Sequence, residues 1–299
     1  MGTSKELVLV TGAGGKLGRL AVEYLLDHYE GPIAATTRQP EKLMDLTDRG
    51  VIVRQADFDL PDKLDDAFAD AKRLLLVSTD TLEVPGQRIK QHNNALKAAL
   101  KAGVQHIVYT SFFNPEPGTA NVTAGDHFST EEAIKNSGFS YTILRNNLYS
   151  ENILQSLTHT VATGQYTAAI GEGKIAYVTR NDCAIAAAAA LAFPSPENRT
   201  MNLTGPKALS GHDIANILGE IAKKRIEYVP QQTPQLVAVY ESFNLPKVVA
   251  EALASFDTAS ANGEYAQLST AFQELTGNVP TSTNQFLQDN FWNNVNICW

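Results

Sequence analysis

A glycine-rich turn near the start of the chain has the residue types and spacing of a phosphate-binding loop. Gly12, Gly15 and Gly18 follow one another at every third position. They come after an apolar segment, residues 8–10, and an amphipathic helix is expected to begin at about Lys16. Glycine permits a close approach of the backbone to a pyrophosphate, and the helix N-terminus offers free N–H groups. The sequence therefore predicts a dinucleotide site, with a plain strand–turn–helix connection as the alternative.

The residue after the second expected strand distinguishes between the two nicotinamide dinucleotides. NAD sites usually carry an acidic residue there, which binds the ribose 2′-hydroxyl, whereas NADP sites tend to carry Arg. This chain has Arg38 after the apolar segment 33–37, with Lys42 one helical turn further on. A guanidinium binds a 2′-phosphate through two parallel hydrogen bonds. The sequence thus predicts NADP(H) as the cofactor, with a merely solvated Arg38 as the alternative.

Alternating strands and helices must position these residues. In the first half, strands are expected at 51–54, 74–77, 107–111 and 141–145, and helices at 61–70, 86–102 and 125–136. Right-handed crossovers between such units produce a doubly wound parallel sheet, with ligands outside the carboxyl ends of its strands. The predicted fold class is therefore α/β, of the Rossmann type.

Beyond residue 150 the pattern is less regular. Helices are expected at 182–193, 211–224, 234–243, 246–261 and 283–295, with short strands near 175–178 and 200–203. Such segments usually close over the strand ends and shape a substrate pocket. We therefore expect an NADP-binding Rossmann domain at residues 1–150. A smaller, mixed and mostly helical C-terminal lobe at 151–299 is expected to bind the substrate and to be partly interleaved with the first domain.

Composition narrows the class of protein. The chain has 299 residues, of which 43% are hydrophobic and 19% charged, as is typical of globular proteins. Its formal charge of −8 argues against a nucleic-acid partner. The longest apolar run, 184–193, is too short to span a membrane and predicts a buried helix. The first six residues are polar and contain no secretory signal.

Cysteine and histidine usage gives no sign of a disulfide framework or a metal site. Cys183 and Cys298 lie far apart, and the six histidines lack paired metal-ligand spacing. The sequence thus indicates a cytoplasmic protein that acts on a small molecule without a metal or a membrane partner. Whether an apolar outer helix face forms a homodimer or covered core is left open.

Several segments of the chain resemble the NmrA-like branch of the atypical short-chain dehydrogenases. They are residues 10–18, Arg38, 55–58, 109–111, 126–131, 144–152 and 171–175. The central segments look like NADPH-dependent type-2 quinone oxidoreductases and the related triphenylmethane dye reductases. The resemblance extends from residue 7 to about 285, and the tail 292–299 lies outside it.

The resemblance implies roles for residues at the strand ends. The pyrophosphate would lie against Gly12, Gly14, Gly15, Lys16, Leu17 and Gly18. Arg38 would bind the 2′-phosphate, Asp57 an adenine edge, and Ser78 and Thr79 would pass near a ribose. Phe58 would form a hydrophobic wall, with an ordinary core position as the alternative. The nicotinamide would lie near Asn146, Asn147, Leu148, Tyr149, Ser150 and Glu151.

A proton relay is missing from the sequence. Short-chain dehydrogenases that reduce ketones use a Tyr-x-x-x-Lys pair, in which the tyrosine protonates the developing alkoxide. No tyrosine of this chain has lysine four residues later, and His127 and Glu131 occupy the matching place. A quinone does not need this acid, because the hydroquinone anion takes a proton from water, and a triarylmethyl cation needs no proton at all. The predicted function is hydride transfer from NADPH to a quinone or a similar flat aromatic acceptor.

The candidate catalytic residues are His127, Asn146 and Tyr149. His127 is a candidate proton donor or partner of a quinone oxygen, Asn146 could orient a carbonyl or the nicotinamide amide, and Tyr149 could stack on the acceptor. The alternatives are a backbone-bonded histidine, an amide that satisfies a buried loop, and simple packing.

Three further charged residues have weaker assignments. Glu131 and its neighbour Glu132 are expected to be helix-surface charges. Arg88, which opens the helix 86–102 together with Gln87, is a candidate for contact with phosphate or substrate, with a solvated basic face as the alternative. The missing relay also fits another class of protein, a non-catalytic NADP(H)-binding redox sensor that acts through a protein partner.

Overall fold

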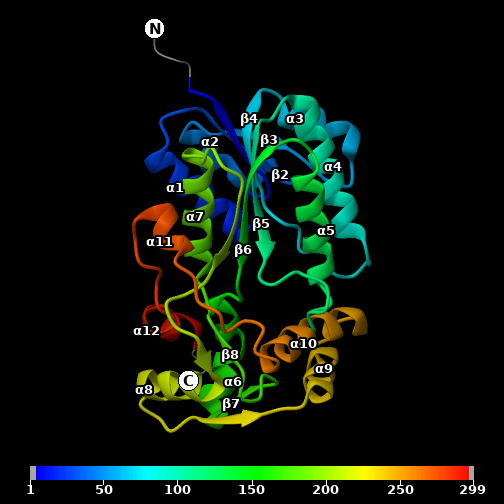
Figure 1. Cartoon of the computed structure of the whole chain (residues 1–299). Helices are drawn as coiled ribbons and strands as arrows, with labels where there is room; N and C mark the ends of the chain where they lie inside the picture. The colour runs from blue at the N-terminus through cyan, green and yellow to red at the C-terminus, as the bar shows by residue number, and fades with distance from the viewer. Residues whose placement is uncertain (1–4, 296–299) are drawn as a thin grey trace. The chain divides into compact units, whose positions relative to one another are not determined.

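The computed structural model describes residues 5–295, and these divide into two compact units that are interleaved along the chain (Figure 1). The first unit contains the chain up to residue 112 together with 126–145 and 181–201. The second contains 113–125, 146–180 and the chain from residue 202 onward. Cys298 and the end of the tail, 296–299, lie outside the described residues.

A seven-stranded sheet forms the centre of the first unit. Its strands lie in the order β3 (Ile52–Gln55), β2 (Ile33–Thr37), β1 (Leu7–Val10), β4 (Ala71–Leu76), β5 (His106–Phe112), β6 (Ser140–Asn146) and β9 (Arg199–Leu203). The pairs β1–β2, β1–β4, β2–β3 and β4–β5 are parallel. Strands β2 and β3 are added on one side of β1, and β4, β5 and β6 are added on the other side. This is the strand order of the doubly wound dinucleotide-binding fold, and it confirms the predicted fold class.

Helices cover both faces of this sheet (Figure 1). On one face lie α1 (Lys16–His28), α2 (Met44–Asp48) and α7 (Arg180–Ala192), and on the other lie α3 (Leu64–Phe68), α4 (Gln87–Ala102) and α5 (Ala124–Lys135). Strand residues such as Leu74 and Leu76 are fully buried because they pack against Phe68, Leu96 and Ile134 of the covering helices. The alanine-rich run expected to form a buried helix is α7.

The second unit is smaller in sheet content and mostly helical. Strand β7 (Gln165–Ala168) pairs in parallel with β11 (Glu227–Pro230), and β8 (Lys174–Ile175) pairs antiparallel with β10 (Leu209–Ser210). Its helical segments are η3 (Ser150–Ser156), α6 (Leu157–Thr163), α8 (Gly211–Ala222), α9 (Thr233–Ser242), α10 (Lys247–Ala261), α11 (Ala271–Thr276) and α12 (Thr283–Asn294). The four helices expected at 211–224, 234–243, 246–261 and 283–295 are confirmed as α8, α9, α10 and α12.

The structure departs from the expected pattern at the short strands. The strand expected near 200–203 is β9, and it joins the main sheet beside β6, a pairing that the sequence did not predict. The strands β7 and β11 were also not predicted, because four-residue strands carry too short a pattern to be recognised. None of the helices formed within residues 5–295 is both long and apolar enough to cross a membrane.

Candidate active site

The glycine turn between β1 and α1 forms a cradle that has no room for side chains. Gly12 adopts a φ of +63°, a conformation that other residues rarely take. A Cβ on Gly14 would lie 2.6 Å from Oγ1 of Thr37, and one on Gly18 would lie 2.5 Å from the carbonyl oxygen of Gly12. Both glycines are therefore required by the packing of the turn against β2 and of α1 against the turn.

The N-terminus of α1 is left open to a ligand. Its N-cap, Gly15, supplies no side-chain hydrogen bond, and the first turn carries no acidic residue. Gly12, Gly14, Gly15 and Lys16 are exposed, whereas Leu17 and Gly18 are buried against the sheet. The free N–H groups and the positive end of the helix dipole suit a pyrophosphate. These residues fit the phosphates of a dinucleotide.

Arg38 follows β2 with its guanidinium uncommitted. The side chain is exposed, and it forms no hydrogen bond or ion pair with any residue in the described part of the chain. Its backbone is held, because Nε2 of Gln55, the last residue of β3, donates to the Arg38 carbonyl oxygen at 3.2 Å. This arrangement leaves a full set of donors for an anion beside the glycine turn.

The residues after β3 and β4 are positioned by their neighbours. Asp57 accepts a hydrogen bond from the backbone N–H of Asp59 at 3.0 Å, and Phe58 packs against the core with its ring edge to Phe68. The contact favours the core alternative for Phe58. After β4, the Ser78 N–H donates to Oγ1 of Thr110 at 2.9 Å.

Thr79 begins a buried polar network that contains both histidines of this region. Its backbone N–H donates to Nε2 of His92 at 3.1 Å, so that His92 carries its proton on Nδ1, which lies 2.9 Å from Oγ1 of Thr130. Burial lowers the pKa of His92 to about 3, with a smaller effect from the positive charge of Arg88. His92 is therefore a neutral, structural histidine.

His127 is buried and engaged at both ring nitrogens. Nδ1 lies 2.9 Å from the hydroxyl of Tyr109, and Nε2 lies 3.5 Å from Nη1 of Arg88. An arginine only donates, so Nε2 must be the acceptor nitrogen. Burial lowers the pKa of His127 well below its usual range, and Arg88 and His92 lower it further. This geometry favours the structural alternative for His127 over the proton donor.

Glu131 differs from the expectation of a helix-surface charge, which is wrong for this residue. Its side chain is fully buried and accepts hydrogen bonds from Nε and Nη2 of Arg145 at 2.9 and 2.7 Å. The hydroxyl of Ser111 donates to it at 2.6 Å. Glu132 is the surface residue of the pair, with a side chain that is 45% exposed. The sequence pattern did not reveal the role of Glu131 because this residue lies on α5, whereas its partners Ser111 and Arg145 lie on β5 and β6.

Arg88 is also buried, which excludes the solvated basic face. Nε donates to the carbonyl oxygen of Thr79 at 2.9 Å, and Nη1 lies 3.8 Å from Oδ2 of Asp126. Gln87, its neighbour, donates instead to the carboxylate of Asp59. Arg88 thus places a positive charge beneath the surface at the carboxyl end of β4.

In the second unit, the residues that follow β6 form a separate polar group. Asn146, the last residue of β6, is buried, and its Nδ2 donates to the hydroxyl of Tyr149 at 3.1 Å. No residue described by the structure hydrogen-bonds its Oδ1. Asn147 is satisfied at both ends, since it donates to the Tyr265 carbonyl and accepts from the Leu148 N–H. Asn146 therefore has acceptor capacity to spare, and Asn147 does not.

Tyr149, Ser150 and Glu151 belong to the same group. The guanidinium of Arg180 lies 4.9 Å from the ring centre of Tyr149, and Glu151 accepts from the Arg180 backbone N–H at 3.0 Å. Oγ of Ser150 lies 3.3 Å from Oγ1 of Thr283. Leu148 is buried. Arg180 thus contacts the segment twice, with its guanidinium at the Tyr149 ring and with its backbone N–H at Glu151.

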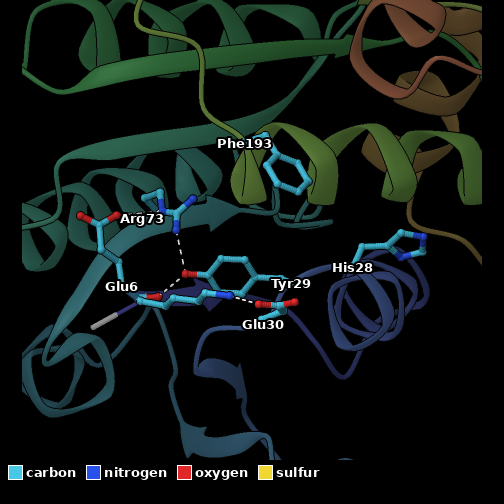
Figure 2. Close-up of a pocket in the computed structure, with 7 residues that line it drawn as sticks. Glu6, His28, Tyr29, Glu30, Arg73 and Phe193 are labelled. Carbon is cyan, nitrogen blue, oxygen red and sulfur yellow. Dashed lines mark hydrogen bonds and ion pairs between the residues drawn. The ribbon is translucent and has the colours of Figure 1, made fainter. Parts of the chain in front are cut away.

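A hollow of about 560 Å³ lies elsewhere on the first unit, at the start of β4 (Figure 2). None of the predicted site residues lines it. Its most buried charge is Arg73, which donates to the carbonyl oxygens of Leu191 and Ala192 at 2.8 and 2.7 Å and to the hydroxyl of Tyr29 at 2.7 Å. These contacts cap the C-terminus of α7, so we assign Arg73 a structural task.

Comparison with known proteins identifies the family to which the chain is similar. Residues 4–287 match the model of the NmrA-like family. Quinone oxidoreductase 2 of Escherichia coli (strain K12) is 34% identical over 278 residues, which cover 93% of this chain and 96% of the relative.

Two solved structures are also similar. The NADPH-dependent quinone oxidoreductase from Escherichia coli, complexed with NADPH, superposes with a TM-score of 0.89 at 34% identity and covers 95% of this chain and 99% of its own. The Citrobacter sp. triphenylmethane reductase complexed with NADP(H) has a TM-score of 0.87 at 33% identity, with the same coverage. The chain therefore belongs to the NmrA-like family.

Proposed function

We propose that this protein is an NADPH-dependent oxidoreductase that transfers hydride to a quinone or a similar flat aromatic acceptor. The proposal is supported by the open glycine turn, by the uncommitted guanidinium of Arg38, and by the similarity to reductases that act on quinones and triphenylmethane dyes. When bound, NADPH supplies the hydride. The remaining steps depend on what the protein's own residues do.

Binding of the cofactor is assigned to the residues at the strand ends of the first unit. The α1 N-terminus and the turn at Gly12, Gly14 and Gly15 hold the pyrophosphate, and Arg38 binds the 2′-phosphate. Asp57 accepts from the adenine edge, and Ser78 and Thr79 line the ribose. The end of β2 carries Thr37 and Arg38 in place of the acidic residue that binds a free 2′-hydroxyl in NAD sites.

One observation carries the choice of acceptor. His127 and Glu131 hold the two positions of the usual proton relay. His127 contacts Arg88 and Tyr109, and Glu131 is bonded to Arg145 and Ser111. Because both side chains are held by these contacts, neither is placed to donate a proton to a developing alkoxide. An acceptor that needs no positioned acid, such as a quinone or a dye cation, matches this arrangement, and catalysis is by positioning.

The group Asn146 to Glu151 is proposed to hold the nicotinamide and the acceptor. The spare acceptor capacity of Asn146 Oδ1 suits an amide N–H, and the aromatic ring of Tyr149 suits a flat acceptor. Ser150 and Glu151, which are tied to Thr283 and Arg180, keep the segment rigid. We further propose a cytoplasmic location and a small-molecule acceptor as the only partner that the reaction requires.

The test is oxidation of NADPH by the purified protein, followed by the loss of nicotinamide absorbance. The acceptors are a benzoquinone, a naphthoquinone, a triphenylmethane dye and a simple ketone, each repeated with NADH. We expect turnover with the quinones and the dye, none with the ketone, and a strong preference for NADPH. Tight NADPH binding without turnover of any acceptor would contradict the proposal and indicate a redox sensor.

A further inference from the structure

We propose that Arg88 supplies the fixed positive charge that stabilises the oxyanion formed on a quinone acceptor, in place of a proton donor. This inference rests on the proposed function and names the residue that replaces the missing acid. It predicts that Arg88 helps acceptors that become negative and opposes acceptors that carry a positive charge.

The guanidinium of Arg88 is buried but incompletely paired. Only 6% of the Arg88 side chain is exposed. Nε donates to the Thr79 carbonyl oxygen, and Nη1 has only the long contacts to His127 Nε2 and Asp126. Nη2 has no hydrogen-bond partner among residues 5–295. A buried charge costs free energy unless it is well paired, so an under-paired one is a candidate for function.

The charge of Arg88 lies at the carboxyl end of the sheet, beside His127. Arg88 reaches the end of β4, where Thr79 lies, and contacts His127. His127 stands where ketone-reducing relatives of this fold carry the tyrosine that protonates the alkoxide. The positive charge is therefore within 3.5 Å of the side chain that occupies the position of the acid. An electrostatic group at this place acts on the oxygen that would otherwise be protonated.

Hydride transfer changes the charge of a quinone and of a dye cation in different ways. A quinone accepts a hydride, which is two electrons with one proton, from the reduced nicotinamide, which is thereby oxidised. The quinone becomes a hydroquinone monoanion, and water then donates the second proton. A triarylmethyl cation accepts the same hydride and becomes neutral. A fixed positive charge stabilises the transition state of the first reaction and repels the substrate of the second.

The surrounding groups decide how strongly this charge is felt. Among residues 5–295, Asp126 is the carboxylate within salt-bridge range of Arg88, at 3.8 Å, and its side chain is 26% exposed. Asp80 lies further away, and the other neighbours, His92, His127 and Tyr109, are neutral because burial opposes their charged forms. Asp126 therefore masks Arg88 in part, and its removal should strengthen the field.

The experiment compares two acceptors within each variant. Arg88→Gln removes the charge, Arg88→Lys retains it, and Asp126→Asn unmasks it. Lys90→Gln, an exposed residue of the same helix, is the matched control. We expect Arg88→Gln to lower kcat/KM for a naphthoquinone by about 10- to 100-fold, while kcat/KM for the triphenylmethane dye is unchanged or raised. Arg88→Lys should recover part of the ratio, Asp126→Asn should increase it, and Lys90→Gln should leave it unchanged.

A binding measurement tests the charge without turnover. The probe is 4-nitrophenol, whose anion is coloured, bound to the protein in the presence of NADP+. We expect the wild-type protein to lower the pKa of the bound phenol and Arg88→Gln to abolish this shift. Wild-type protein that reduces neither acceptor but still lowers the phenol pKa would overturn the proposed function and not the electrostatic task of Arg88.

Two results would contradict the role of Arg88 at the acceptor oxygen. An equal loss with quinone and dye, together with a raised KM for NADPH, would assign Arg88 to cofactor binding or to folding. If the pKa of the bound phenol were as low in Arg88→Gln as in the wild-type protein, the charge of Arg88 would not act at the acceptor site. Thermal melting of each variant separates loss of folded protein from loss of the field, and the quinone-to-dye ratio is independent of the amount of folded enzyme.

Discussion

Two arginines at the carboxyl end of the sheet illustrate how the same side chain serves opposite tasks. Arg38 is exposed and uncommitted, so it is free to adjust to a doubly charged phosphate. Arg88 is buried and held by the Thr79 carbonyl, so its charge has a fixed place. A mobile charge is suited to binding a ligand, whereas a fixed charge is suited to a transition state, because no reorganisation is needed during the reaction.

Arg38→Ala should weaken NADPH binding and leave NADH binding nearly unchanged. A charge-assisted pair is worth roughly 1.5–3 kcal/mol, which corresponds to a loss of affinity of about 10- to 150-fold. Binding of each cofactor is measured by titration calorimetry, with Arg49→Ala, another exposed arginine, as the control. Equal losses for both cofactors would remove Arg38 from the 2′-phosphate.

At the level of secondary-structure elements, a buried carboxylate joins a covering helix to two strands of the sheet. Glu131 on α5 accepts two hydrogen bonds from Arg145 on β6 and one from Ser111 on β5. The three elements are thus joined at one carboxylate. The pair is bidentate and its carboxylate is fully buried, so the loss of either partner leaves a poorly solvated charge behind, which costs much more than breaking an exposed pair.

Glu131→Ala should destabilise the protein by about 3–5 kcal/mol, because it removes the buried carboxylate that pairs with Arg145. Glu132→Ala, at the exposed neighbouring position, should change the free energy of unfolding by only about 0.5 kcal/mol. Urea denaturation of the two variants gives both values. Similar losses in the two variants would contradict the structural importance of the buried pair.

In the second unit, Asp257 of α10 is an ionisable group with unfavourable surroundings. It accepts a hydrogen bond from the Ala169 N–H at 2.7 Å, and its negative charge adds to the effect of burial in raising the pKa of Tyr166, Tyr177, Tyr228 and Tyr240. Burial raises the pKa of Asp257 from 3.8 to about 6, against a smaller opposing effect of this hydrogen bond. The folded protein therefore binds the proton more tightly than the unfolded chain does.

The sign of the pH dependence follows from this shift. As the pH rises from about 4 to about 6, the unfolded chain loses the Asp257 proton before the folded protein does, and stability falls. Asp257→Asn should remove this penalty and stabilise the protein by about 1–3 kcal/mol above pH 6, with no gain below pH 4. Melting temperatures across this range test it, with Asp289→Asn on α12 as the exposed control. A gain that is independent of pH would contradict the assignment.

On the scale of the whole molecule, the interleaving of the two units matters for how the chain folds. The segment 181–201 belongs to the first unit, although it follows the segment 146–180, which belongs to the second. It supplies α7 and the edge strand β9. The assignment of residues 1–150 to NADP binding and of 151–299 to substrate binding, with partial interleaving, remains a prediction, and each of the two compact units is made of non-consecutive segments.

A fragment that ends at residue 150 should not fold cooperatively. It lacks α7, whose buried residues run almost without interruption from Asp182 to Ala192, and it exposes the sheet face that α7 covers. Circular dichroism during heating measures this, with the full chain as the control. A sharp melting transition in the fragment would show that the first domain is complete without 181–201.

The sequence by itself determined the features that depend on neighbouring residues. The glycine turn, Arg38 after the second strand, and the order of strands and helices up to residue 146 were predicted because turns, strand ends and hydrophobic periodicity are local patterns. The missing relay was visible for the same reason, since a Tyr-x-x-x-Lys pair is a local spacing.

The tertiary structure alone decided what depends on distant partners. Glu131 of α5 meets Ser111 of β5 and Arg145 of β6 only in the folded protein. Likewise, the sequence around β9 does not show that this strand joins the main sheet beside β6. Burial in the folded protein lowers the pKa of His127, and Arg88, which is 39 residues away, lowers it further. Burial and hydrogen bonding set the cost of a charge, and both arise only when remote segments pack together.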